Sequence, residues 1–326
     1  NFYLNELKKN KIKLINFEYK YKLLKIFKLI KFLKNTEYDV TIAYLRNPSL
    51  IAEISRLFGA RWKLIVSERN NYINENYFTR LFRRLLHLIA DYVIVNSNTN
   101  LNNILHNSPW IKRVSLIQNF TDLDYFKPQN KFFEKDKNKI TLVGVGKYSF
   151  QKNIINLVEA LHIVSKNAPE LNININWYGD NFTNYNTNSY LNKIRSSIDD
   201  YKLNKIFNLN PATSNILEKY HASSALILPS LYEGFPNVVS EAISCGLPAL
   251  ISNICDNKVL VDKSNGYLFD PNNPDDIADK IISFSRLDKE QKKIMSISSR
   301  KRAENLFNKK KYLNSHLNII KLLNNY

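Results

Sequence analysis

Residues 229–252 read PSLYEGFPNVVSEAISCGLPALIS, and this stretch decides the fold. A short apolar run, residues 225–228, precedes it and is typical of a buried strand. Pro236 carries the chemistry of a helix start, Gly246 that of a helix end, and a second apolar run follows at 249–251. A strand, a loop, a helix and a strand in this order predict a parallel-sheet unit of an α/β fold.

Two carboxylates mark this unit. Glu233 lies before the helix and Glu241 lies in about its second turn, so both can face a ligand at the carboxyl end of the strand. The backbone N–H groups of residues 234–238 would point at an anion there. The segment resembles the Glu-x7-Glu signature of retaining GT-B glycosyltransferases of the family 4 type. The matching residues are Glu233-Gly234-Phe235-Pro236, Glu241-Ala242 and Gly246-Leu247-Pro248. An ordinary strand–helix turn with two surface glutamates is the alternative.

A second loop carries two lysines. Residues 144–153 read GVGKYSFQKN, which lacks the third glycine of a dinucleotide fingerprint. The loop resembles the family's Gly-Arg-Leu-x3-Lys-Gly element, whose Arg and Lys hold the donor's diphosphate. Lys147 takes the place of the arginine, as a point charge rather than a bidentate fork, and Lys152 that of the lysine. Asn153 replaces the usual glycine, which left-handed backbone geometry tolerates. Two solvated lysines are the alternative.

The resemblance implies that a sugar moves from a nucleoside diphosphate to an acceptor hydroxyl with retention of configuration. The leaving diphosphate needs preorganised positive charge and N–H dipoles, which the two lysines and the helix start can supply without a metal. Glu241 suits the ribose hydroxyls, and Glu233 suits the sugar and the charge that develops at its anomeric carbon. We therefore expect Glu233 and Lys152 to be catalytic. The expected donor-binding residues are Lys147, Gly146, Gly179, Gly234, Phe235, Pro236, Asn237, Val238 and Glu241.

The alternation of strands and helices, with the resemblance, predicts a GT-B architecture of two Rossmann-like domains facing a crevice. Residues 1–124 would form the acceptor-side domain, 125–309 the nucleotide-sugar-binding domain, and 310–326 a C-terminal helix that could cross back to the first domain. The chain begins at Asn1 and its single methionine is Met295, so we expect the start of the first domain to be missing.

The predicted boundary rests on residues 118–128, QNFTDLDYFKP, which resemble the family's interdomain crossover. Asp122-Leu123-Asp124 within it also spells the metal-binding Asp-x-Asp of another glycosyltransferase fold, but its position matches the linker. We therefore expect no metal and no other cofactor. In the first domain, Glu68 and Arg69 at a strand end are candidate acceptor contacts, or else an ion pair. The family often has a histidine there, and this chain has none.

The net charge of +18 is concentrated at the two ends of the chain, where residues 1–35 hold ten lysines and two glutamates. No helix-turn-helix, zinc-finger or aromatic RNA-binding signature accompanies it, so we expect an anionic membrane surface rather than nucleic acid as the partner. Residues 20–34 have helical periodicity. The outer face would carry Lys25, Lys28 and Lys31 with Leu24 and Phe32, and the inner face Leu23, Ile26, Phe27, Leu29, Ile30 and Leu33. This pattern is typical of an interfacial helix, or of a layer helix with solvated lysines.

The sequence thus predicts a retaining glycosyltransferase. It would move a hexose or N-acetylhexosamine from a nucleotide-sugar to a hydroxyl of a lipid-linked glycan, in cell-surface polysaccharide or glycan biosynthesis. The expected location is cytoplasmic and peripheral, at the inner face of the membrane. The alternatives are a nucleotide-sugar epimerase of the same fold and a non-catalytic GT-B partner subunit.

Overall fold

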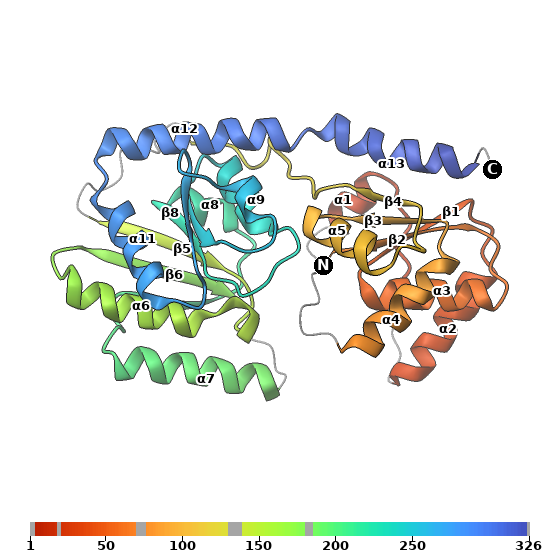
Figure 1. The fold of residues 1–326 in the computed structure, drawn as a ribbon, viewed down its shortest axis with the longest axis horizontal. Helices are drawn as coiled ribbons and strands as arrows, with labels where there is room; N and C mark the ends of the chain where they lie inside the picture. The colour runs from red at the N-terminus through yellow and green to blue at the C-terminus, as the bar shows by residue number, and fades with distance from the viewer. Residues whose placement is uncertain (1–3, 18–20, 70–75, 130–138, 180–184, 325–326) are drawn as a thin grey trace. The chain divides into compact units, whose positions relative to one another are not determined.

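The computed structural model describes residues 4–17, 21–69, 76–129, 139–179 and 185–324. The chain divides into two compact units: unit 1 holds residues 1–117 and 314–326, and unit 2 holds residues 118–313. Each unit is an α/β structure with its own parallel sheet (Figure 1), which confirms the predicted fold class. The three-part domain division stays a prediction.

Unit 2 is built on a six-stranded sheet of order β10-β9-β8-β5-β6-β7. Its strands are β5 (Ile140–Val145), β6 (Ile173–Gly179), β7 (Phe207–Pro211), β8 (Ala225–Leu228), β9 (Ala249–Ser252) and β10 (Gly266–Phe269). From β5 the chain moves one way to β7, then returns to place β8 on the other side of β5. This reversal is the topological switch point, where the loops after β5 and β8 part and open sheets bind ligands.

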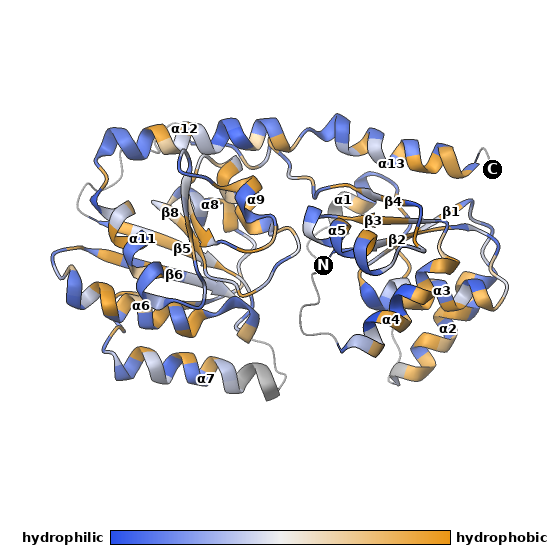
Figure 2. Cartoon of the chain, viewed as in Figure 1, coloured by the Kyte–Doolittle hydropathy of each residue, from blue (hydrophilic) through white to orange (hydrophobic). Residues whose placement is uncertain are grey.

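Helices cover the sheet of unit 2. They are α6 (Ile154–Asn167), α7 (Tyr185–Asp200), α8 (Ile216–His221), α9 (Asn237–Ser244), α10 (Asn257–Leu260), α11 (Pro274–Arg286) and α12 (Lys289–Leu306). Helix α11 packs on α6, which also contacts α7, whereas α12 packs on α9. Strands β8 and β9 are buried along their whole length, which explains why they are continuous apolar runs (Figure 2). Gly246 ends α9 with φ 73°, as predicted.

Unit 1 has a four-stranded parallel sheet of order β1-β2-β3-β4. The strands are β1 (Val40–Tyr44), β2 (Lys63–Glu68), β3 (Tyr92–Val95) and β4 (Val114–Leu116). The helical elements are α1 (Leu4–Lys9), α2 (Lys22–Lys34), α3 (Arg46–Leu57), α4 (Tyr77–Leu86), the 3₁₀ turn η1 (His87–Ile89) and α5 (Asn98–Asn107). The last helix, α13 (Lys309–Asn324), begins in unit 2 and ends in unit 1.

Helix α2 is helical as predicted, but the prediction of its two faces was wrong in part. Phe32 is half-buried and its ring centroid lies 5.2 Å from that of Phe17. Leu23 and Phe27, expected inward, are 83% and 64% exposed. Helix α2 packs on α3, so the side chains of α2 that face α3 are the ones that become buried. This buried face does not coincide with the middle of the apolar face expected from the sequence. The three lysines expected on the outer face are exposed.

Candidate functional site

The loops after β5 and β8 meet at the switch point of unit 2. Lys152 Nζ lies 2.6 Å from Glu233 Oε1, and the two side chains are 15% and 11% exposed. Gln151 fastens the same loops: its carbonyl accepts from Leu231 N–H at 2.9 Å, and its Nε2 donates to the Tyr232 carbonyl at 2.9 Å. The two residues expected to be catalytic are therefore brought together, on a framework that Gln151 holds. The sequence reasoning gave Gln151 no role.

Gly146 makes room for Lys152. A Cβ added at Gly146 would lie 2.6 Å from Lys152 Cε, so the lysine stem crosses directly over this glycine. Gly146 N–H donates to the Tyr178 carbonyl at 3.0 Å, which fixes the loop against β6. A Cβ at Gly179 would lie 2.4 Å from the Gly146 carbonyl oxygen, so this second glycine permits the close approach. Both expected glycines thus serve the placement of Lys152.

The end of the β5 loop adopts the backbone geometry that the sequence suggested. Asn153 has φ 53° and ψ 38°, in the left-handed region. Its Nδ2 donates to the Pro271 carbonyl at 2.7 Å, so the side chain also anchors the start of α6. Lys147, on the same loop, is exposed.

The start of α9 presents unused backbone donors. Among the residues that the structure describes, the N–H groups of Gly234, Phe235, Asn237 and Val238 donate no hydrogen bond. Helix N-termini of this kind attract anions through their N–H groups and the helix dipole. Phe235 itself is buried, so its side chain anchors the loop while its N–H stays available.

Asn119 supports this helix start, and the sequence reasoning missed it. Its Nδ2 donates to Asn237 Oδ1 at 2.6 Å and to the Phe235 carbonyl at 3.3 Å. The stretch around Asn119 was interpreted only as a linker. Its polar side chain, in the polar pair Gln118-Asn119 after Leu116-Ile117, was the one signal available.

Glu241 projects from the second turn of α9 toward a buried tyrosine. The Tyr220 hydroxyl donates to Glu241 Oε2 at 2.8 Å, and Tyr220 is fully buried. Burial raises the pKa of Glu241 to about 6, although the Tyr220 hydrogen bond opposes the rise. Glu241 is therefore a carboxylate whose charged form is easily stabilised by further donors.

Tyr148 is buried below the loops that follow β5 and β8. Its hydroxyl lies 2.5 Å from the Asn210 carbonyl and 3.2 Å from that of Trp177, and burial raises its pKa.

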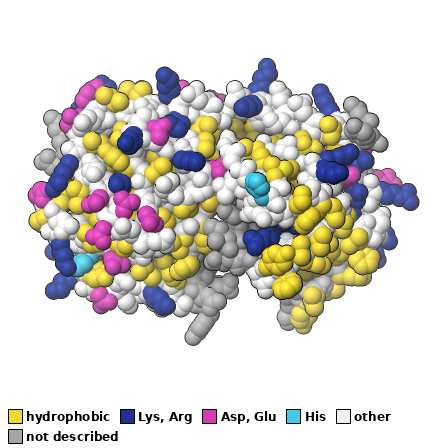
Figure 3. Space-filling model, viewed as in Figure 1, with side chains coloured by type: hydrophobic (Ala, Val, Ile, Leu, Met, Phe, Trp, Pro, Cys, Tyr) yellow, Lys and Arg dark blue, Asp and Glu magenta, His cyan; other side chains and the backbone are white. Residues whose placement is uncertain are grey.

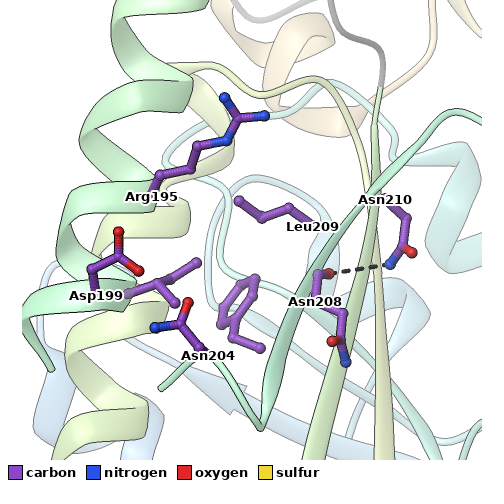
Figure 4. Close-up of a pocket in the computed structure, with 8 residues that line it drawn as sticks. Arg195, Asp199, Asn204, Asn208, Leu209 and Asn210 are labelled. Carbon is purple, nitrogen blue, oxygen red and sulfur yellow. Dashed lines mark hydrogen bonds between the residues drawn. The ribbon is translucent and has the colours of Figure 1, made fainter. Parts of the chain in front are cut away.

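Next to Asn210, a cavity of about 430 Å³ lies between α7 and the edge strand β7, and Arg195 and Asp199 of α7 are among the residues that line it (Figure 4). Its lining residues are Arg195, Ile198, Asp199, Asn204, Phe207, Asn208, Leu209 and Asn210, none of which was predicted to bind the donor.

The acceptor candidates of unit 1 have partners of their own. Glu68 is 8% exposed, forms an ion pair with Arg83 and lies 2.8 Å from His87 Nε2. Glu68 is thus ion-paired, but with Arg83 and not with the neighbouring Arg69. Arg69 lies 4.7 Å over the Tyr44 ring at the ends of β1 and β2.

Three further observations bear on function, and they concern the Asp122 turn, metal ligands and membrane-spanning helices. Asp122 Oδ1 accepts the N–H groups of Asp124 and Tyr125 at 3.0 and 3.2 Å, which makes it a turn cap. Across the described ranges, no three His, Cys, Asp or Glu side chains gather as metal ligands would. Within the same ranges, every helix is too short or too polar to span a bilayer.

Known proteins resemble this chain in sequence. Residues 126–302 match the family model described as Glycosyl transferases group 1. The amylovoran biosynthesis glycosyltransferase AmsD of Erwinia amylovora is 25% identical over 256 residues, which cover 76% of this chain and 68% of that protein. A UDP-Gal:alpha-D-GlcNAc-diphosphoundecaprenol alpha-1,3-galactosyltransferase of Escherichia coli is 29% identical over 206 residues, 60% of this chain and 51% of that protein. The chain thus spans about half to two thirds of the length of these curated relatives.

Solved structures resemble it in fold. HepE of Anabaena, crystallised with UDP-glucose, superimposes with a TM-score of 0.82 at 18% identity, over 99% of this chain and 88% of that one. A glycosyltransferase from Rickettsia africae gives a TM-score of 0.77 at 21% identity, over 98% and 87%. These likenesses show the GT-B fold. Because the family model takes in more than half of the chain, including both loops of the switch point, the chain belongs to the glycosyl transferases group 1 family.

Proposed function

We propose that the protein is a retaining glycosyltransferase that moves a hexose or N-acetylhexosamine from a nucleoside-diphosphate sugar to a hydroxyl of a lipid-linked glycan. The observation that carries this proposal is the Lys152–Glu233 pair beside the unused N–H groups at the start of α9. Positive charge, oriented dipoles and a carboxylate converge there at the switch point of a parallel sheet. A diphosphate with a sugar attached needs this combination.

The donor's diphosphate would bind the α9 N–H groups and Lys152. Lys152 pairs with Glu233; a bound phosphate would give its ammonium group a second anion, so that Nζ would bridge the two. Glu233 is then held toward the sugar. Of the donor residues predicted from the sequence, Lys147 and Asn237 are exposed, and Lys147 would reach the diphosphate by folding back over its loop.

The reaction breaks the bond between the anomeric carbon and the phosphate oxygen, and the electron pair leaves with the diphosphate. The acceptor oxygen forms its bond on the same face of the sugar, and its proton passes to the departing phosphate oxygen. Glu233 stabilises the positive charge that develops at the anomeric carbon. Glu241 would accept hydrogen bonds from the ribose hydroxyls. Charge on the leaving group is met by Lys152 and N–H dipoles, so we propose that no metal takes part.

The relatives support the substrate classes. The Escherichia coli protein is named for a UDP-linked galactose donor and a diphosphoundecaprenol-linked acceptor, and the Erwinia protein for amylovoran biosynthesis. Structures of HepE contain UDP and UDP-glucose. We therefore propose a UDP-sugar donor, a polyprenyl-linked acceptor and a role in polysaccharide biosynthesis. The corresponding location is cytoplasmic and peripheral at the inner face of the membrane.

A panel of UDP-, GDP- and ADP-sugars tests the proposal, with release of the nucleoside diphosphate as the readout. We expect the wild type to hydrolyse UDP-sugars slowly without acceptor, and Glu233→Gln to lose roughly 10²–10³-fold of that rate. Glu218→Gln, which changes an exposed glutamate of α8, is the matched control and should keep it. Equal rates in the wild type and Glu233→Gln would overturn the proposal. If EDTA abolished the activity and Mg²⁺ or Mn²⁺ restored it, the metal-free mechanism would be wrong.

A further inference from the structure

Helix α4 and the 3₁₀ turn η1 that follows it turn most of their basic side chains inward. Arg80, Arg83, Arg84 and His87 recur at positions i, i+3, i+4 and i+7, the spacing at which a helix usually places its core residues. Arg83, Arg84 and His87 are 8%, 4% and 3% exposed. Arg84 Nη1 donates to Ser108 Oγ at 2.9 Å, so this buried guanidinium has a polar partner. The face that α4 turns to the core of unit 1 is therefore cationic.

Buried carboxylates hold this face in place. Glu68 pairs with Arg83, and the His87 ring lies between Glu53 and Glu68. Glu53 is 1% exposed. Removing one partner of a buried charge pair leaves the other uncompensated, which is strongly unfavourable. Helix α4 cannot roll to bury its other face without breaking these pairs.

Most apolar side chains of α4 are consequently turned to solvent, although Leu81 and Leu86 are half-buried. Phe78, Phe82 and Leu85 recur at i, i+4 and i+7, and they are 75%, 61% and 46% exposed. Tyr77 and Leu88 flank them at 63% and 56%. Figure 3 shows hydrophobic side chains gathered over α4. Single exposed apolar residues need no explanation, but a continuous apolar stripe marks a contact surface.

The side chains of helix α2 indicate what kind of partner the exposed apolar face of α4 contacts. Both α2 and α4 pack on α3. On α2, Leu23 and Phe27 are exposed together with Lys28 and Lys31. Neither α2 nor residues 76–89 contain an aspartate or glutamate. Exposed aromatic and aliphatic side chains among lysines, without acids, complement the acyl boundary and anionic head groups of a bilayer.

We infer that α4 inserts its Phe78–Phe82–Leu85 face into the interfacial region of an anionic lipid bilayer, beside the lysines of α2. The inference deepens the membrane location proposed above, and it rests on unit 1 alone. Donor binding and cleavage are assigned to unit 2, so the two proposals can fail separately.

Co-sedimentation of the full chain with vesicles of equal parts phosphatidylglycerol and phosphatidylcholine tests it. We expect the wild type to bind, and the double variant Phe78→Ser, Phe82→Ser to bind at least about tenfold more weakly. The matched control removes two similarly exposed side chains of α12, Ile294→Ser with Ile297→Ser, which are 56% and 57% exposed in the wild type. The control should bind like the wild type. Lipid-free hydrolysis of a nucleotide-sugar should be the same in all three proteins.

Salt separates insertion from electrostatic adsorption. Binding through the α2 lysines is screened at high salt, whereas insertion of phenylalanine is not. The variant Lys25→Glu, Lys28→Glu, Lys31→Glu should therefore lose mainly low-salt binding, and the phenylalanine variant mainly high-salt binding. A tryptophan placed by Phe82→Trp should be quenched by lipids with brominated acyl chains, and one placed by Ile297→Trp should not. Wild-type binding by the phenylalanine variant at high salt, equal loss in the α12 control, or no quenching at position 82 would overturn the inference.

Discussion

Helices α4 and α11 carry apolar residues at the same spacing, but α11 buries these residues in the core and α4 exposes them to solvent. In α11 the residues at i, i+4 and i+7 are Ile277, Ile281 and Phe284, all fully buried. In α4 they are Phe78, Phe82 and Leu85, all exposed. The two helices belong to different units, and each unit offers its helix a different partner.

The difference teaches that periodicity predicts a helix but not which face is inward. Helix α11 lies against α6 and β10, which offer apolar side chains, and its polar first turn is capped by Asn273. Helix α4 meets the buried carboxylates of Glu53 and Glu68, so its arginines face the core. We therefore assign surface contact to unit 1 and donor chemistry to unit 2.

The largest effect on stability should come from removing a carboxylate that pairs with α4, the helix whose arginines face inward. Glu68→Ala leaves Arg83 and His87 buried without this carboxylate, and we expect the free energy of unfolding to fall by about 3–5 kcal/mol. Glu37→Ala, at an exposed position of the same unit, should change it by less than about 0.5 kcal/mol. Urea denaturation of both variants is the measurement. A stable Glu68→Ala protein would mean that the arginines do not fix the orientation of α4.

The next prediction compares the two apolar stripes directly. Ile281→Ala opens a cavity in the core of unit 2 and should lower the free energy of unfolding by about 2–5 kcal/mol. Phe82→Ala removes a larger side chain but an exposed one, and should change it by less than about 0.5 kcal/mol. The shift in urea midpoint gives both values. Similar losses in the two variants would contradict the assignment of opposite faces.

Within unit 2, the two glutamates of the signature should separate binding from turnover. Glu241→Ala should weaken nucleotide-sugar binding by roughly 1.5–3 kcal/mol, because hydrogen bonds to a carboxylate are lost. Glu233→Ala should mainly lower turnover. Calorimetric titration of the donor into each variant measures the first effect. Unchanged affinity in Glu241→Ala would remove its ribose role.

A smaller effect is the pH dependence of donor binding. Burial raises the pKa of Glu241 to about 6. Ribose hydroxyls that donate to the carboxylate favour its charged form, so affinity should rise with pH below about 6 and level off above it, by at most tenfold per pH unit. The comparison is with Glu241→Gln, which removes this titrating carboxyl while keeping the size of the side chain. A profile that is the same in this variant would show that Glu241 does not face the donor.

The contiguous parts of the fold and site were predictable from the sequence. The strand, loop and helix around Glu233 follow local rules, since Pro236 starts α9, Gly246 ends it and the apolar runs are fully buried strands. The elements β4, β7 and β10 escaped prediction, because a serine, asparagines or a glycine interrupts the apolar run that marks β8 and β9.

Contacts between distant residues could not be predicted from spacing. Lys152 and Glu233 are 81 residues apart, and Asn119 and Asn237 are 118 apart. Resemblance placed the first pair in one site, but nothing in the sequence indicated that they form an ion pair. Glu53 and His87 come from different elements, 34 residues apart, and meet only in the folded chain.

The stereochemistry of donor cleavage tests the central claim most directly. An α-linked nucleotide-sugar that binds in the panel is incubated with the wild type, and the anomeric proton of the released sugar is followed by NMR before mutarotation. The account predicts that the α-anomer appears first, in step with the nucleoside diphosphate, because cleavage at the Lys152–Glu233 site proceeds with retention. The β-anomer appearing first would contradict it.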